Sequence, residues 1–332
     1  MTEIQLSYLP DSEWNKRLEN SSLGTIYQTK EYGLYFNTQY KSKPIFLKFY
    51  SAKGELVGQI VVFQSFLGRR KLAKLFGRGF IYSAVAKTSG VLPKYTNWFF
   101  GPIIFDTSYQ NEISESFANL LASWKSKFYG STHPLNGDFN FPHNYNIKKE
   151  NAATFIIDLS KSLESIFYAT DKKSVQKNIK RSEERGVSVT QISSRKDIII
   201  YHELLNKHRL DKNLVSYSLD DVIQGYELLH PMGQTGFLAW YNEIPIGGIF
   251  ISSFNNYINE WGIARSQIDT EKKLYSLDLL RWKVIEWGIQ NKCKYYDLSG
   301  VKSTHRSEKD EALFRNKAKW GGKLVNYGTF SK

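Results

Sequence analysis

The 332-residue chain contains very little sulfur, with one cysteine, Cys293, and two methionines. A single cysteine excludes an intramolecular disulfide and leaves too few thiolates for a zinc site or an iron–sulfur cluster within one chain. None of the six histidines belongs to an HExxH pattern. His202 and His208 lie six positions apart, so a helix would turn them to different faces. We therefore expect no metal site, and a reducing compartment fits the composition.

Long apolar segments are also missing. The N-terminal sequence MTEIQLSYLP has neither the basic n-region nor the apolar h-region of a signal peptide. The longest apolar stretch, residues 236–254, is interrupted by Asn242, Glu243 and Pro245. The sequence therefore predicts a cytoplasmic protein that does not span a membrane.

Acidic residues are outnumbered: 32 Asp and Glu face 45 Lys and Arg, which gives a formal net charge of +13. No acidic residue occurs between Glu55 and Asp106. This segment holds seven basic residues: Arg69, Arg70, Lys71, Lys74, Arg78, Lys87 and Lys94. Such a segment attracts phosphates of RNA, of a nucleotide-linked substrate or of an anionic membrane surface. A solvated basic face without a specific partner is the alternative interpretation.

Two hairpin-like segments of the chain share one pattern. They are IFLKFYSAKGELVGQIVVF (45–63) and GFLAWYNEIPIGGIFIS (236–252), each with two apolar runs separated by a turn. Phe46, Leu47, Phe49 and Tyr50 align with Phe237, Leu238, Trp240 and Tyr241, and the second runs align as Val57-Gly58 with Ile246-Gly247. The repeat predicts two copies of one α/β unit, about 190 residues apart.

The remaining pattern predicts helices and strands mixed along the chain. The clearest helix is residues 274–291, which has a broad apolar stripe and leads into the strand KYYDLSG (294–300). Further strands are expected near 80–86, 98–105, 155–159, 187–192 and 257–264, and helices near 28–38, 111–129, 161–185 (ended by Gly186) and 197–211. Helices combined with antiparallel hairpins indicate an α+β protein with mixed sheets.

Loops that bind phosphate are poorly represented. There is no GxxxxGK[ST] pattern. KLFGRG (74–79) approximates the loop with which acetyltransferases hold the pyrophosphate of coenzyme A, but the strand-like FIYSAVA follows it instead of a helix. No GxSxG nucleophile pattern occurs, and Cys293 at the end of an apolar helix is typical of an inert thiol.

Near the C-terminus, basic residues alternate with apolar and aromatic ones. After a charged loop (Lys302–Glu311), the sequence ALFRNKAKWGGKLVNYG carries Arg315, Lys317, Lys319 and Lys323. A lysine held against a buried tryptophan can stabilise an oxyanion in acyl transfer. A basic edge strand that discourages aggregation would show the same pattern.

The order of these motifs resembles the Fem-type (FemABX) aminoacyltransferases, a family with the acetyltransferase-like (GNAT) fold. FLAWYNEIPIGGIFI, YINEWGIAR, the segment Trp282–Gly300 and RNKAKWGG follow one another as in the second half of that family, while IYQTKEY (26–32) and FFGPIIFD (99–106) occupy places of its first half. The resemblance implies two tandem GNAT domains, 1–148 completed by 322–332, and 149–321. The segment 161–211 is too short and too punctuated for the coiled-coil arm of some members.

The resemblance also implies a function: transfer of an amino acid from aminoacyl-tRNA to an amine of a peptidoglycan-type or other phosphate-bearing cell-envelope precursor. It implies no cofactor and no DNA partner. If the precursor is lipid-linked, the protein would be peripheral at the inner membrane face. Two alternatives stay open: an acyl-CoA-dependent N-acyltransferase that modifies an amino sugar of a surface polysaccharide, and a non-catalytic RNA- or envelope-binding protein.

Six residues receive roles from the resemblance. Lys317 would stabilise the tetrahedral oxyanion or the leaving ribose oxygen, and Asp106 would orient or deprotonate the amine. The substrate-binding residues would be Arg209 for the acceptor phosphate, Trp261 at a place where the family often has tyrosine, Tyr296 and Asp297. The chain departs from the family pattern at Trp261, which lacks the tyrosine hydroxyl, and at Asn316, where an aromatic residue often precedes the lysine.

Overall fold

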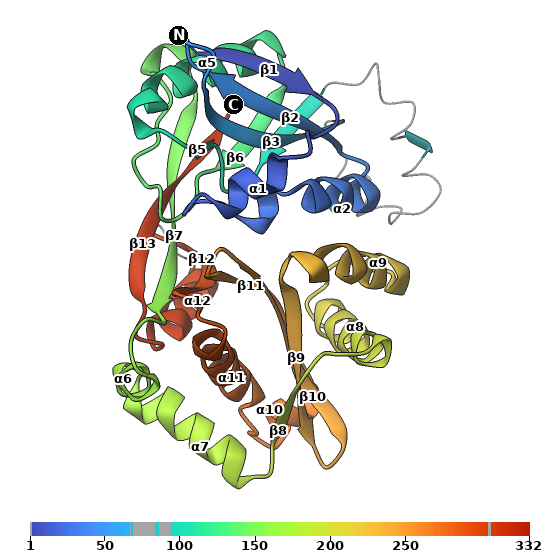
Figure 1. Cartoon of the computed structure of the whole chain (residues 1–332). Helices are drawn as coiled ribbons and strands as arrows, with labels where there is room; N and C mark the ends of the chain where they lie inside the picture. Colours follow the sequence, from blue (N-terminus) through green and yellow to red (C-terminus); the bar gives the residue numbers. More distant parts are fainter. Residues whose placement is uncertain (1, 67, 69–83, 86–93, 305–306) are drawn as a thin grey trace. The chain divides into compact units, whose positions relative to one another are not determined.

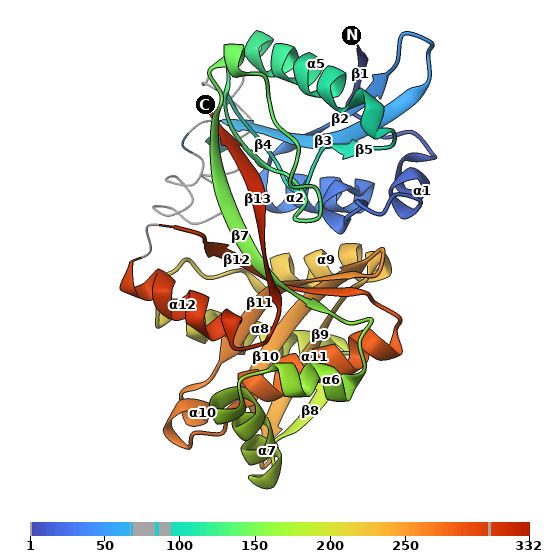
Figure 2. The same ribbon diagram turned by 90° about the vertical axis from the view of Figure 1, so that its left-hand side faces the viewer.

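A computed structural model of the chain describes residues 2–66, 68, 84–85, 94–304 and 307–332. The predicted strand near 80–86 lies mostly outside the described residues. The KLFGRG loop lies entirely outside them. The basic residues between Glu55 and Asp106 also lie outside them, except Lys94. Residue contacts divide the chain into two compact units, 1–152 with 326–332, and 153–325. Each boundary falls inside a long strand, β7 (Lys148–Asp158) or β13 (Lys323–Ser331), so the backbone passes from one unit to the other within these strands (Figure 2).

The first unit is a mixed sheet with helices (Figure 1). Its strands follow the order β1-β2-β3-β4-β6-β13, and β5 pairs with β3. β13 pairs with β6 in antiparallel fashion, and β4 pairs with β6 in parallel. The elements are β1 (Glu3–Ser7), α1 (Trp14–Glu19), α2 (Lys30–Tyr40), β2 (Lys43–Tyr50), β3 (Leu56–Phe66), β4 (Lys94–Trp98), β5 (Ile103–Ile104), α5 (Gln110–Ser123) and β6 (Lys127–Ser131).

Two expectations for the first unit were wrong in extent. The strand expected at 98–105 is interrupted, because Phe100 has a φ of 50° and Pro102 has no N–H to donate to a ladder. The helix expected to reach residue 129 ends at Ser123. Lys125 then takes a φ of 48°, and β6 begins at Lys127.

The second unit has α-helices on both faces of its sheet, whose strands follow the order β7-β12-β11-β10-β9-β8. One apolar cluster contains Phe237 and Ala239 of β9 with residues of α11, and another contains Leu238 of β9 with residues of α8 and α9. Alternate residues of one strand thus face different helices, with α8 and α9 on one side of the strands and α11 on the other (Figure 1). The elements are α6 (Leu163–Ala169), a π-helical turn (Lys172–Gln176), α7 (Lys177–Glu184), β8 (Ser188–Gln191), α8 (Arg195–Leu210), α9 (Leu219–Leu229), β9 (Gln234–Tyr241), β10 (Ile244–Phe254), β11 (Tyr257–Arg265), α10 (Gln267–Glu271), α11 (Ser276–Gln290), β12 (Tyr295–Lys302) and α12 (Glu308–Ala318).

Both predicted hairpins are present, as β2–β3 and β9–β10, and they share an irregularity. In each hairpin the register shifts just after the turn, because one residue of the second strand has no residue opposite it in the first strand. That residue is Val57 in the first hairpin and Ile246 in the second, and the sequence alignment matches these two. The alignment of the first strands was wrong by one residue, because Gly58 pairs with Phe49 while Gly247 pairs with Ala239.

The segment after β12 differs from expectation. Part of the predicted charged loop belongs to α12, which begins after a capping box in which Ser307 and Asp310 bond each other's backbone N–H groups. Arg315 and Lys317 therefore lie on a helix, and the edge-strand interpretation is wrong for them. Helix α9 was not predicted at all.

His133 is expected to make the stability of the protein depend on pH. The side chain is 2% exposed, its Nδ1 accepts the Leu135 N–H at 3.1 Å, and burial lowers its pKa from 6.5 to about 3. The unfolded chain binds the proton below pH 6.5 and the folded protein does not, so stability falls as the pH drops from 6.5. At pH 5 this loss amounts to about 2 kcal/mol. In His133→Asn the amide oxygen replaces Nδ1 as the acceptor and does not titrate. Urea unfolding at pH 7 and pH 5 should therefore show a decrease in the free energy of unfolding that is about 2 kcal/mol smaller in the variant than in the wild type. Equal losses in both proteins would contradict the assignment.

Candidate functional site

A buried ion pair between Glu260 of β11 and Arg281 of α11 forms the centre of the candidate site. The two residues are 8% and 4% exposed. Arg281 Nε donates to Glu260 Oε2 at 2.8 Å, and Nη2 donates to Oε1 at 2.9 Å, which gives the paired geometry of a guanidinium and a carboxylate. Burial raises the pKa of Glu260, but the adjacent Arg281 outweighs it and holds the pKa below its usual value. The pair is therefore charged.

Two neighbours, Tyr296 and Asn316, form hydrogen bonds with this pair. The Tyr296 hydroxyl donates to Glu260 Oε2 at 3.0 Å, and burial together with the negative Glu260 raises the pKa of Tyr296 well above its usual value. Asn316 Oδ1 accepts a hydrogen bond from Arg281 Nη1 at 3.2 Å. The departure from the family pattern at position 316 thus supplies an acceptor for the buried guanidinium.

Asp297 holds a turn in β12. It accepts hydrogen bonds from Thr154 Oγ1, from the Tyr257 hydroxyl at 2.6 Å and from the Ser299 N–H at 2.7 Å. Ser299 has a φ of 64°, a left-handed conformation that these bonds help to fix, and its hydroxyl donates to the Glu260 carbonyl. Burial raises the pKa of Asp297.

Lys317 of α12 lies against this turn and is 5% exposed. Its Nζ donates to the Ser299 carbonyl at 2.9 Å and to the Gly300 carbonyl at 3.2 Å. An ammonium has three N–H groups, and two of them have acceptors among the described residues, which leaves the third for a substrate atom there. Burial lowers the pKa of Lys317, and the charges of Glu260 and Asp297 oppose that effect. The lysine is thus a fixed, desolvated proton donor.

The cluster can stabilise negative charge that develops beside Lys317. Two basic groups, Arg281 and Lys317, share one buried region with two carboxyl groups, Glu260 and Asp297. In a buried position a charge acts more strongly than in water, and these groups are already oriented by hydrogen bonds. The arrangement suits acyl transfer through an oxyanion.

Asp106 belongs to the first unit. Its carboxylate is exposed and accepts the N–H and hydroxyl of Ser108 at 2.9 and 2.7 Å. These bonds lower the pKa of Asp106, which makes it a weak proton acceptor. Here the residue caps the short helix Thr107–Tyr109.

Arg209 and Trp261 are in the second unit but outside the cluster. Arg209 Nε donates to the Val215 carbonyl at 2.7 Å, and its guanidinium stacks over the Tyr217 ring at 4.3 Å, so it orders the loop after α8. Trp261 is the extra residue of a β-bulge in β11 and packs against the cluster that contains Tyr201. Of the predicted residues in the second unit, Lys317, Tyr296 and Asp297 are thus brought together, while Arg209 and Trp261 are not.

Sequence reasoning missed Glu260 and Arg281. Each was visible as the one charge inside a short, otherwise uncharged and mostly apolar run, in YINEW and in LLRW. A charged residue in such a run is buried only when it is paired, so two of them in neighbouring elements are a signal of an ion pair.

Within the described ranges, no group of three or more His, Cys, Asp or Glu residues is placed to hold a metal ion. In the same ranges, no helix combines the length and the apolar character needed to cross a lipid bilayer.

No protein-family model matches the chain, and no curated protein matches it in sequence. The solved structure of FemX superposes with a TM-score of 0.72 over 98% of this chain and 96% of FemX, at 11% identity. The chain has the fold of FemX. The structure of L-PGS from Bacillus licheniformis matches with a TM-score of 0.54 over 97% of this chain and 91% of its own, at 13% identity.

A tandem GNAT protein from the clavulanic acid biosynthesis pathway matches with a TM-score of 0.55, 10% identity, and coverage of 99% of this chain and 98% of its own. The FemX fold and this match confirm the predicted fold class, an α+β protein with tandem GNAT-like halves, and confirm the Fem-type resemblance at the level of the fold. Between β7 and β9, where every residue is described, the chain forms short separate helices and no coiled-coil arm.

Proposed function

We propose that this protein is an acyltransferase that moves an aminoacyl group from aminoacyl-tRNA to an amine of a phosphate-bearing cell-envelope precursor. The observation that carries the proposal is the buried Lys317, held by the Ser299 and Gly300 carbonyls with one N–H to spare, on the fold of FemX. The FemX and L-PGS structures support an aminoacyl donor and an envelope acceptor. The predicted domain limits, 1–148 with 322–332 and 149–321, are part of the proposal.

In the proposed reaction, the acceptor nitrogen attacks the ester carbonyl of the aminoacyl group. The C–N bond forms, the carbonyl oxygen becomes negative, and Lys317 donates its remaining N–H to it. The C–O bond to the ribose then breaks, the ribose oxygen takes up a proton, and the nitrogen loses one. A lysine whose pKa is lowered protonates a leaving oxygen more readily than an ordinary lysine.

The net charge of +13 supports phosphate-bearing partners, tRNA and the acceptor alike, with an attraction that salt screens. We propose a cytoplasmic protein that is peripheral at the inner membrane face when the acceptor is lipid-linked. DNA is not among the proposed partners, and the reaction needs no cofactor.

A second candidate is an acyl-CoA-dependent N-acyltransferase acting on an amino sugar, which the similarity to the tandem GNAT protein favours. Label transfer by the purified protein into an envelope extract separates the two. Bulk tRNA charged with radiolabelled amino acids is compared with labelled acetyl-coenzyme A. RNase-sensitive incorporation from tRNA supports the proposal, incorporation from the thioester alone supports the second candidate, and incorporation from neither favours a non-catalytic binding protein.

Replacing Asp106 with asparagine tests the predicted base. Because its carboxylate is exposed and bonded to Ser108, we expect kcat of Asp106→Asn to stay within threefold of wild type. The measurement is the rate of label transfer at saturating donor. A fall of 100-fold, with the fold intact by circular dichroism, would establish Asp106 as a catalytic residue after all.

A further inference from the structure

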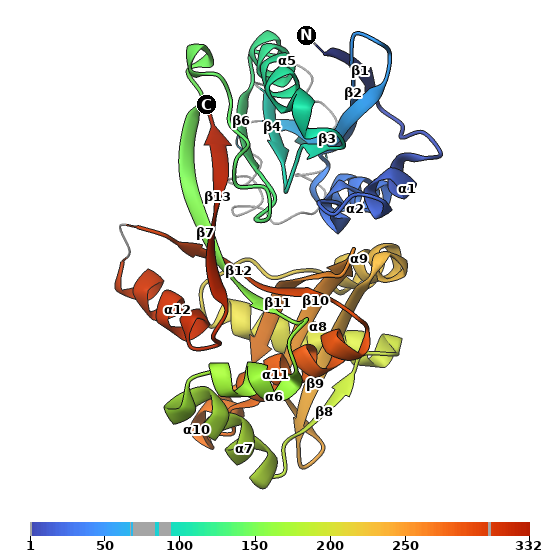
Figure 3. The same ribbon diagram turned by 60° about the vertical axis from the view of Figure 1, so that its left-hand side comes forward.

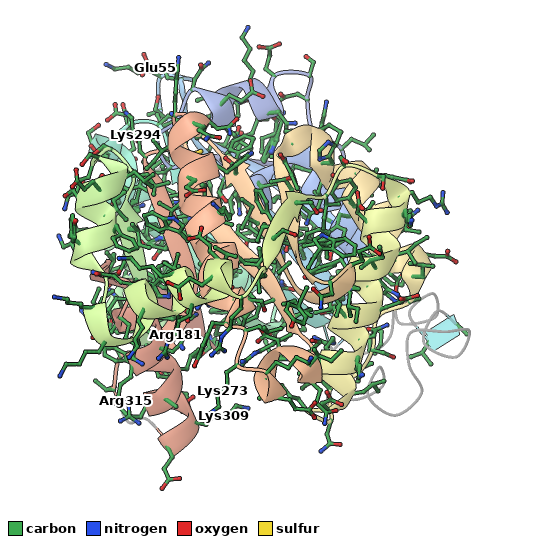
Figure 4. All side chains as sticks on the ribbon, turned by 90° about the horizontal axis from the view of Figure 1, so that it is seen from below. Glu55, Arg181, Lys273, Lys294, Lys309 and Arg315 are labelled. Atoms are coloured by element: carbon green, nitrogen blue, oxygen red, sulfur yellow. The ribbon has the colours of Figure 1, made fainter. Side chains whose placement is uncertain are left out.

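A run of positive charge covers the π-helical turn and the first five residues of α7, and Glu183 and Glu184 follow it at the end of the helix. Between Lys172 and Arg181 there are five basic residues and no acidic one. Four of them are exposed: Lys172, Lys173, Lys177 and Lys180. In Figure 4, which views the molecule from below, the charged end of Arg181 lies on the outside of the second unit.

The helix presents these charges in one direction. Val175, Ile179 and Ser182 are buried, and their spacing of four and three residues places them on one side. Lys177, Lys180 and Arg181 occupy the remaining circumference. The apolar side of α7 is therefore buried in the core, and its outer side is basic from Lys177 to Arg181, with the exposed Glu183 and Glu184 in its last turn.

This basic run is continuous with the helix that carries Lys317. The Asp171 N–H donates to the Lys319 carbonyl at 2.8 Å, so the start of the run contacts the end of α12, two residues beyond Lys317. The Asp171 carboxylate before the run accepts the N–H and hydroxyl of Ser174, and Glu183 after the run lies 3.8 Å from Lys283 Nζ. Lys319 is itself exposed and extends the run toward α12.

An exposed aromatic ring stands at the edge of the run. Tyr168 at the end of α6 is 69% exposed, and Lys180 lies 6.0 Å from the ring centre of its neighbour Phe167. An exposed ring beside a row of lysines is the combination that binds RNA, because the ring stacks on a base while the lysines neutralise phosphates.

We propose that the α7 basic surface, defined as Tyr168, Lys172, Lys173, Lys177, Lys180 and Lys319, binds the RNA of the donor. The inference rests on the proposed function, in which the donor is aminoacyl-tRNA. The new element is the place where the RNA backbone binds: the second unit, next to the helix that carries Lys317. An anionic membrane is the less suitable occupant, because an interfacial helix turns an apolar face outward and α7 buries its own.

The experiment measures equilibrium binding of uncharged bulk tRNA across a salt series. The test variant combines Lys173→Gln, Lys177→Gln and Lys180→Gln. The control combines Lys53→Gln, Lys125→Gln and Lys127→Gln, three exposed lysines of the first unit, so that both proteins lose the same charge. We expect the test variant to bind about 100-fold more weakly near 0.1 M salt, with the slope of log K against log salt reduced by about three. Tyr168→Ala should weaken binding about tenfold.

The outcomes distinguish a failure of the proposed surface from a failure of the proposed function. If transfer from charged tRNA proceeds and both triple variants bind equally well, the surface is wrong and the function stands. If the wild type neither binds tRNA nor transfers from it, both are wrong. Loss of binding to vesicles with anionic lipid, with tRNA binding unchanged, would assign the surface to a membrane instead. In transfer assays the test variant should raise KM for charged tRNA and leave kcat unchanged.

Discussion

Replacing Lys317 with methionine is expected to lower kcat of the transfer by about 10²- to 10³-fold, the cost of losing one donor to an oxyanion. Methionine fills a similar volume without charge or N–H groups. KM should change little, because Lys317 is assigned to the developing negative charge and not to the bound substrate. Initial rates of label transfer at saturating donor and acceptor give the measurement.

The same variant carries a pH signature that a structural role would not produce. The pKa of Lys317 is lowered from 10.5, so wild-type activity should decline on the alkaline side below that pH as the ammonium loses its proton. This limb should be absent from the residual activity of Lys317→Met. Lys309→Met, an exposed position on α12, is the control. Wild-type kcat in Lys317→Met would remove the lysine from the mechanism, as would an unchanged alkaline limb.

Replacing Arg281 with methionine is expected to destabilise the second unit by about 3–5 kcal/mol. The change leaves Glu260 as a buried carboxylate whose only remaining side-chain donor is Tyr296 within the described residues. Asn316 also loses the group that it bonds. Thermal unfolding followed by circular dichroism and calorimetry should show the loss in the transition assigned to the second unit.

The double variant Glu260→Gln with Arg281→Met distinguishes the cost of leaving one buried charge unpaired from the cost of losing packing contacts. It removes both charges of the pair, so most of the stability lost in Arg281→Met should return. Activity should remain low, because Glu260 also bonds Tyr296 and lies in the strand that bonds Ser299, whose carbonyl holds Lys317. Equal instability of the single and double variants would show that the pair stabilises by packing and not by charge.

Local patterns predicted the elements whose structure depends on neighbouring residues. The alternating runs in 45–63 and 236–252 gave both hairpins, and the apolar stripe of 274–291 gave α11. The αL glycine at 186 ends the helical segment as its sequence suggested, with a φ of 80°. These features need no information about distant parts of the chain.

The candidate site could not be assembled in that way. Glu260 and Arg281 are 21 residues apart, and only the packing of α11 against β11 makes them a pair. Lys317 was found by resemblance, but its acceptors are backbone carbonyls, which carry no sequence signal. Helix α12 did have a local signal, the capping box of Ser307 and Asp310, which was overlooked among the charges around it.

The paired bulges at Val57 and Ile246 bear on the history of the chain. A register fault at matching places in two hairpins is most simply explained by duplication of one ancestral gene segment. In both copies the bulged residue lies in an apolar cluster, so the matching bulge serves the same packing in each half, while the charged groups of the second unit lie on β11, α11, β12 and α12.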